Sequence, residues 1–92
     1  MMDFIWDTPT DITLKIAKRI KNIRKRRKIT QQQLAARSNV SYASLKKFEQ
    51  TGQISLISLV KIAMELDLTD ELNNLFTTPV YKSIDEVIND GR

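Results

Sequence analysis

The sequence contains no cysteine and no histidine. Without cysteine, disulfides and thiolate metal sites are excluded, and without histidine the chain lacks the commonest general base and metal ligand. We also find no Gly-rich phosphate loop, no nucleophile–base pair and no apolar run long enough to span a membrane. We therefore expect a protein that is not an enzyme and that uses no metal and no cofactor.

Acidic residues are missing from the middle of the chain. Residues 12–48 carry twelve basic and no acidic side chains, residues 1–11 carry three acids and no base, and residues 49–92 carry eight acids and three bases. The net charge of +4 therefore hides one strongly positive block, the pattern expected of a phosphate-binding face. Because the first base, Lys15, follows an acidic start, nothing resembles a signal peptide, and we expect a cytoplasmic location.

Residues 30–50 have the pattern of two short helices joined by a tight turn. Thr30 and Gln33 form a T-x-x-Q capping box that opens the first helix, and Asn39 tolerates the left-handed backbone that would end it. Ser41 caps the second helix. The inner face of that helix is Val40, Leu45 and Phe48. Its outer face is small or polar with two positive charges: Tyr42, Ala43, Ser44, Lys46 and Lys47. Such a helix is suited to contact an anionic surface.

This stretch resembles the lambda-repressor-like helix-turn-helix proteins, also called the Cro-type or XRE family. The matching positions are Thr30, Gln31, Leu34, Ala35, Val40, Ser41, Leu45, Phe48, Glu49, Gly52, Ser55, Leu56, Leu59, Ile62 and Ala63. The resemblance implies an all-α fold, a five-helix DNA-binding domain over residues 12–76. An N-terminal arm over residues 1–11 precedes it, and a C-terminal extension with a possible short helix follows over residues 77–92.

The resemblance also assigns site residues. In such proteins the second helix lies across the phosphate backbone and the third enters the major groove of duplex DNA. The implied base-reading residues are Tyr42, Ala43, Ser44, Lys46 and Lys47. The expected phosphate contacts are Gln31, Gln32, Ser41, Arg24, Arg27 and Lys28. Arg24 and Glu49 are expected to form a partly buried ion pair that ties the first helix to the end of the third.

Helical periodicity predicts the remaining elements. A first helix begins at Thr10 or Asp11 and carries one apolar stripe, namely Ile12, Ile16, Ile20 and Ile23. Ser55 caps a fourth helix whose apolar residues supply most of the core: Leu56, Leu59, Val60, Ile62, Ala63 and Leu66. Thr69 caps a fifth, and the core is closed by Leu72, Leu75 and Phe76.

Two terminal segments keep several interpretations open. The apolar cluster Phe4–Trp6 packs on its own domain, contributes to a dimer interface, or pairs as a strand with another chain. A second capping box, Ser83 to Glu86, predicts a short helix that docks on the domain, on a second subunit or on another protein.

We expect a transcriptional repressor that reads a palindromic operator as a homodimer, because one small module gives a short footprint on DNA. An alternative is the antitoxin of a toxin–antitoxin pair. Size and architecture resemble HipB-type antitoxins, which repress their own operon and bind a HipA-like kinase. A third interpretation, an adaptor that no longer binds DNA, is disfavoured by Lys46 and Lys47.

Overall fold

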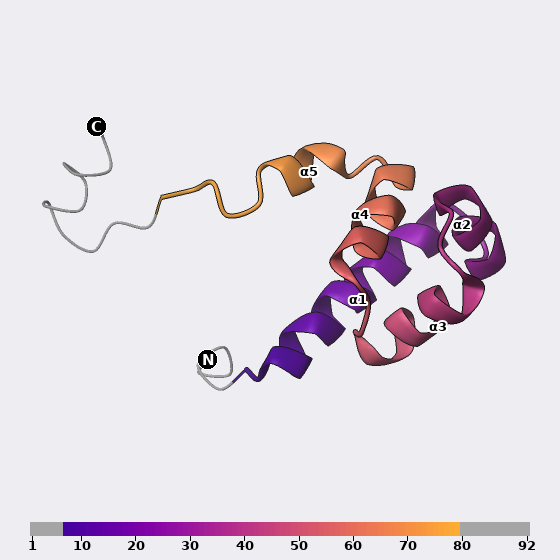
Figure 1. Ribbon diagram of the computed structural model, residues 1–92, viewed down its shortest axis with the longest axis horizontal. Coiled ribbons are helices and arrows are strands. Elements are labelled where there is room, and N and C mark those ends of the chain that lie inside the picture. The colour runs from indigo at the N-terminus through magenta and orange to yellow at the C-terminus, as the bar shows by residue number, and fades with distance from the viewer. Residues whose placement is uncertain (1–6, 80–92) are drawn as a thin grey trace, which may run out of the picture.

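The computed structural model describes residues 7–79, and over this range the regular secondary structure is all α-helix (Figure 1). The helices are α1 (Pro9–Arg26), α2 (Gln31–Ser38), α3 (Tyr42–Thr51), α4 (Leu56–Glu65) and α5 (Thr69–Asn73). This confirms the predicted all-α, five-helix fold. The Phe4–Trp6 cluster and the Ser83–Glu86 capping box lie outside the described residues. Within that range, no helix is both long enough and apolar enough to cross a membrane.

Helix α1 begins at Pro9, slightly earlier than the predicted start at Thr10 or Asp11. The Thr8 hydroxyl accepts from the Asp11 backbone N–H at 3.0 Å, and the Asp11 carboxylate accepts from the Thr8 N–H at 3.1 Å. Proline fits the first helical position because its missing N–H would have no partner there. The backbone hydrogen bond from Thr8 is the main reason why the pKa of Asp11 lies below its ordinary value.

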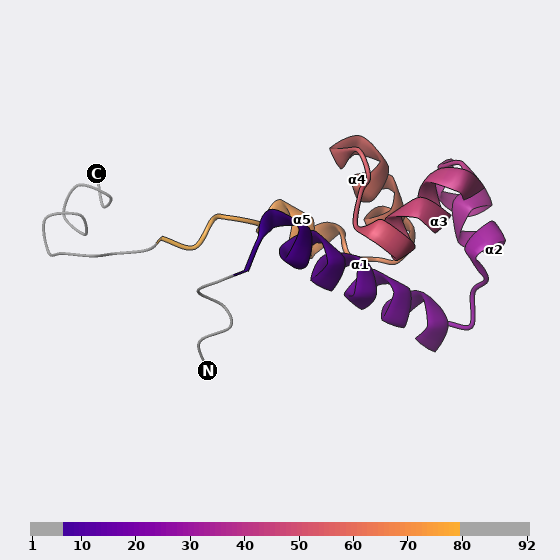
Figure 2. The same ribbon diagram turned by 90° about the horizontal axis from the view of Figure 1, so that it is seen from below.

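The core lies where α2, α3 and α4 gather on one side of α1 (Figure 2). Its buried apolar residues are Ala17, Ile20, Leu34, Ala35, Val40, Leu45, Phe48, Ile62, Ala63 and Leu66. The predicted inner face of α3 is therefore confirmed. The stripe on α1 is shorter than predicted, because Ile12, near the N-terminal end of the helix, is 47% exposed.

Gly52 sets how closely α3 approaches α1. It ends α3 with a left-handed backbone, φ 79°, and a Cβ placed there would lie 2.7 Å from the Thr13 hydroxyl oxygen and 2.8 Å from the Thr13 carbonyl carbon. A side chain at this position would meet both backbone strain and the body of α1. The glycine thus brings the end of the third helix against the first.

The region around α5 differs from the prediction. Thr69 is the first helical residue and not the cap, since Leu68 occupies the cap position without a side-chain hydrogen bond. The helix ends at Asn73, and the chain beyond it leads away from α2 and α3 (Figure 1). Leu75 and Phe76 are therefore 51% and 94% exposed, and they do not close the core. Leu56, also predicted to be a core residue, is 72% exposed at the first turn of α4.

Candidate nucleic-acid interface

The turn between α2 and α3 has the predicted local chemistry. Thr30 and Gln33 form a reciprocal capping box at 2.9 and 3.0 Å, and Asn39 ends α2 with φ 59° and ψ 39°. The Ser41 hydroxyl accepts from the Ser44 backbone N–H at 3.0 Å, which opens α3. Val40 is buried between the two helices. These local bonds fix the direction in which α3 leaves the turn.

Helix α3 has one buried and one exposed side. Leu45 and Phe48 are at most 1% exposed, so the helix is held firmly from behind. All five residues predicted to read bases lie on the exposed side: Tyr42, Ala43, Ser44, Lys46 and Lys47. The Lys46 ammonium lies 5.9 Å from the centre of the Tyr42 ring, within the range of a cation–π contact. This face of α3 is therefore accessible, positively charged and partly aromatic.

The predicted Arg24–Glu49 ion pair is confirmed. Arg24 Nε and Nη2 donate to the two carboxylate oxygens of Glu49 at 2.7 and 3.0 Å, and the side chains are only 9% and 1% exposed. Arg24 Nη1 also donates to the Ile29 carbonyl at 2.8 Å. The sequence further predicts a phosphate contact for Arg24, but this burial and these bonds leave little of its guanidinium surface for a phosphate. Its role in the structure is to join α1 to α3.

Gln31 takes part in the same network, which the sequence interpretation missed. Its Nε2 donates to Glu49 Oε1 at 2.8 Å, so the first residue of α2 is tied to the end of α3. The signal was present in the sequence, because Glu49 is the only acidic residue between Asp11 and Glu65. A buried carboxylate needs several donors, and a glutamine at a neighbouring helix start is a natural source of one.

The other predicted phosphate contacts lie at the surface. Gln32, Ser41, Arg27 and Lys28 are exposed, whereas Gln31 is half-buried. Arg27 is not free in the structure, since its Nη1 donates to Asp67 Oδ2 at 2.9 Å across to the turn between α4 and α5. That pair is solvent-exposed and therefore weak, so an approaching phosphate would compete with it.

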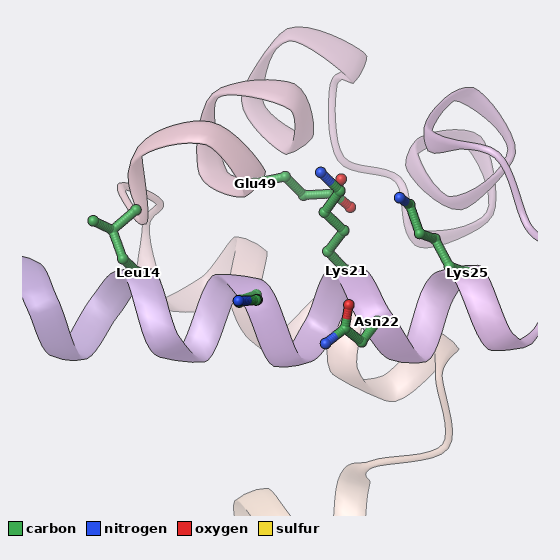
Figure 3. Close-up of a pocket in the computed structure, with 6 residues that line it drawn as sticks. Leu14, Lys21, Asn22, Lys25 and Glu49 are labelled. Atoms are coloured by element: carbon green, nitrogen blue, oxygen red, sulfur yellow. The ribbon is translucent and has the colours of Figure 1, made fainter.

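A further basic surface lies between α1 and α3. A hollow of about 450 Å³ is lined by Leu14, Lys18, Lys21, Asn22, Lys25 and Glu49. Figure 3 shows Lys21 and Lys25 rising from α1 on the side that faces Glu49. We call this hollow the lysine groove. Among the bases in and just after α1, the sequence predicted phosphate contacts for Arg24, Arg27 and Lys28. It gave no reason to single out Lys18, Lys21 and Lys25, which line the groove.

A capped helix-turn-helix with an exposed, basic second helix defines a DNA-binding domain. In agreement, a family model described as helix-turn-helix matches residues 20–72, which is more than half of the chain. The chain belongs to this family, in its XRE or lambda-repressor-like form, and its kind of function is DNA-binding transcription regulation. No curated protein matches the chain.

Proposed function

We propose that the protein is a transcriptional repressor that binds a palindromic operator as a homodimer, with α3 in the major groove. The observation that carries the proposal is the exposed face of α3, held in place by Leu45 and Phe48 behind it. The groove is wide enough for one helix, and bases are distinguished there by donors, acceptors and the thymine methyl group. An exposed helix face with these properties supports direct reading of base edges.

Each exposed side chain of α3 suits one kind of contact. Lys47 can donate to guanine N7 and O6, although a lysine fixes the geometry less strictly than an arginine. Ala43 offers a methyl group to a thymine methyl. Tyr42, 41% exposed beside Lys46, suits a sugar or phosphate at the edge of the groove. The Ser41 hydroxyl donates to the Ser44 hydroxyl at 2.8 Å, at the start of α3. We therefore assign both residues to contacts near the DNA backbone.

Phosphate contacts would orient the domain on the duplex. Gln32 and Lys28 are exposed on either side of the start of α2, and no acidic residue occupies the first turn of that helix. Backbone N–H groups and the positive end of a helix dipole favour phosphate at such a start. These contacts would add affinity but no sequence information.

The proposed dimer interface is the apolar surface at α5. A hollow of about 250 Å³ lies between α1, α4 and α5 and is lined mainly by Ile16, Ile20, Leu59, Ala63, Leu68, Leu72 and Leu75. Arg19 and Glu71 stand at the same hollow with opposite charges. A two-fold interface is self-complementary, so such a pair suits contact with a second copy. Phe76, 94% exposed next to Leu75, is the apolar anchor that we assign to this contact.

A second candidate function is that of an antitoxin. Leu56 and Ile57 are 72% and 67% exposed at the first turn of α4. Exposed apolar side chains at this turn, in addition to those at α5, support a second protein partner, as in the HipB-type proteins that the chain resembles in size and architecture. Co-purification with a HipA-like kinase encoded by an adjacent gene would favour this function, and Leu56→Asp should then abolish the complex. An isolated gene would argue strongly against it.

The repressor proposal is tested by a gel shift with the DNA upstream of the protein's own gene. We expect a specific complex, and we expect Lys47→Gln to weaken binding to this DNA more than binding to random duplex, because the lost contact is to a base. Lys61→Gln on α4 removes one charge away from α3 and serves as the matched control. Equal binding of the wild type to both DNAs would contradict sequence-specific repression at this site.

A further inference from the structure

We propose that the lysine groove binds phosphodiester groups of the DNA strand that runs past the start of α2 and the edge of α3. The proposal rests on DNA binding by this domain and adds a phosphate site on α1, carried by Lys18, Lys21 and Lys25. The strand reaches the groove beside the recognition helix, so both surfaces act on the same duplex.

The three lysines share one face of α1. Their spacing of three and then four residues places them along one side of a helix, and all three line the same hollow. Asn22 adds an amide that can donate a hydrogen bond, and Leu14 lines the hollow as well. Figure 3 shows Lys21 and Lys25 projecting from α1 on the side of Glu49, so these charges converge on one space.

Within the described residues none of these three lysines has an acidic partner, whereas Lys15 and Arg24 of α1, and Arg27 at its C-terminal end, each have one. Over residues 7–79, Lys15 pairs with Asp7 at 2.7 Å, Arg24 with Glu49 and Arg27 with Asp67. No carboxylate lies within ion-pair distance of Lys18, Lys21 or Lys25 over the same residues. Three like charges gathered on one helix face repel each other, and an external anion would relieve that repulsion.

The carboxylate in the groove does not cancel this charge. Glu49 is 1% exposed at its side chain and already accepts two hydrogen bonds from Arg24 and one from Gln31. Its charge is compensated by Arg24, so the groove as a whole keeps the charge of its lysines. A phosphodiester carries one negative charge per nucleotide, and lysine is a mobile point charge that adapts to successive phosphates.

Glu49 also fixes where the groove lies relative to the DNA-facing surfaces. It is bonded to Gln31, which opens α2, and it lies on α3 three residues after Lys46 and seven after Tyr42. Residues at these spacings share one side of a helix. The groove is therefore next to the edge of α3 that carries Tyr42 and Lys46. A backbone that passes this edge and the start of α2 continues along the lysines.

The test measures binding to a random-sequence duplex across a salt series, because phosphate contacts determine non-specific affinity and its salt dependence. The variant is Lys18→Gln/Lys21→Gln/Lys25→Gln. Its binding to the duplex is measured by fluorescence anisotropy from about 50 to about 200 mM salt. Each lost phosphate contact reduces the magnitude of the negative slope of log K against log salt by about 0.9, so we expect a slope shallower by roughly 2 to 3. Lys61→Gln should leave it unchanged, and replacing the three lysines by arginine should preserve it. Circular dichroism confirms that each variant is folded.

The outcomes separate this proposal from the proposed function. An unchanged slope in the folded glutamine variant, with normal binding by the wild type, would overturn the groove alone. No duplex binding by the wild type would overturn both. Calorimetry with inorganic pyrophosphate distinguishes DNA from a free phosphate ligand, and we expect no saturable binding. Saturable pyrophosphate binding that the glutamine variant loses, together with an unchanged DNA slope, would reassign the groove and reject our proposal.

Discussion

At the scale of single residues, Glu49 joins three helices through one carboxylate. Its oxygens accept from Arg24 on α1 and from Gln31 on α2, while the residue itself belongs to α3. The donors come from residues 18 and 25 positions away in sequence, so the bonds constrain tertiary and not local structure. The angle between the two helices of the DNA-binding motif therefore depends on this group.

Removing one partner of the buried ion pair should strongly destabilise the protein. We expect Glu49→Ala or Arg24→Met to lower the free energy of unfolding by ~3–5 kcal/mol, because either change leaves a buried charge without its partner. The double variant Arg24→Met/Glu49→Met should recover much of that loss, since it leaves neither charge. Urea unfolding measures all three. Single variants that cost under about 1 kcal/mol would show that the pair is solvated in solution.

Gly52 and Asn39, two of the residues with a left-handed backbone, should respond differently to substitution. Gly52→Ala should cost more than about 1 kcal/mol, because the methyl group meets Thr13 and the backbone has φ 79°. Asn39→Gly is the matched comparison: Asn39 has φ 59° and is exposed, so glycine relieves strain there. Thermal unfolding of both variants tests this. A Gly52→Ala variant with the melting temperature of the wild type would mean that α3 does not approach α1 so closely.

At the scale of helices, the start of α1 depends on a capping box whose acid titrates. The pKa of Asp11 lies below its ordinary value, chiefly because its carboxylate accepts the Thr8 backbone N–H. The ionised Asp11 carboxylate therefore stabilises the folded protein at pH values above the ordinary pKa of aspartate. This contribution to the free energy of unfolding is lost as the pH falls through the lowered pKa. We expect Asp11→Asn to reduce the loss of stability on acidification. Melting temperatures of the variant and the wild type from about pH 7 to about pH 3 measure this difference. Identical pH profiles for variant and wild type would contradict the cap.

The caps show how far sequence reasoning extends. Thr30, Ser41 and Ser55 were predicted correctly, because a cap depends on bonds to residues three positions away. Pro9 was misplaced because proline is compatible with both an extended arm and a first helical position. The lysine groove was not predicted, since helical spacing groups residues on a face but does not say which neighbouring helix that face meets.

Burial was predicted less well than helix formation. Ile12, Leu56, Leu75 and Phe76 have the apolar character and spacing of core residues, yet all four are substantially exposed. A periodic pattern identifies an apolar face, but whether a face is covered depends on helix length and on tertiary contacts. Helix α5 ends at Asn73, so Leu75 and Phe76 lie beyond the segment that packs on α4.

At the scale of the whole molecule, this exposed apolar surface leads to a prediction about assembly. We expect Phe76→Asp to convert a dimer to a monomer, because it places a charge in the proposed interface. The variant should keep the melting temperature of the isolated domain, since Phe76 is 94% exposed and contributes little to the core. Light scattering after size-exclusion chromatography measures the mass. Ile57→Asp, at the first turn of α4 and equally an exposed apolar residue changed to an acid, is the control. An unchanged dimer would exclude this interface.

The separation of charge has a consequence for how the protein meets its target. Residues 12–48 hold twelve bases without an acid, whereas residues 49–79 hold five acids and one base. Within the described residues, the bases are thus concentrated from α1 to α3, and most of the acids lie on α4, on α5 and in the turn between them. In the field of a polyanion such a molecule rotates while it diffuses, so encounters begin in a productive orientation. The association rate constant should accordingly exceed that of a neutral pair and decline with ionic strength.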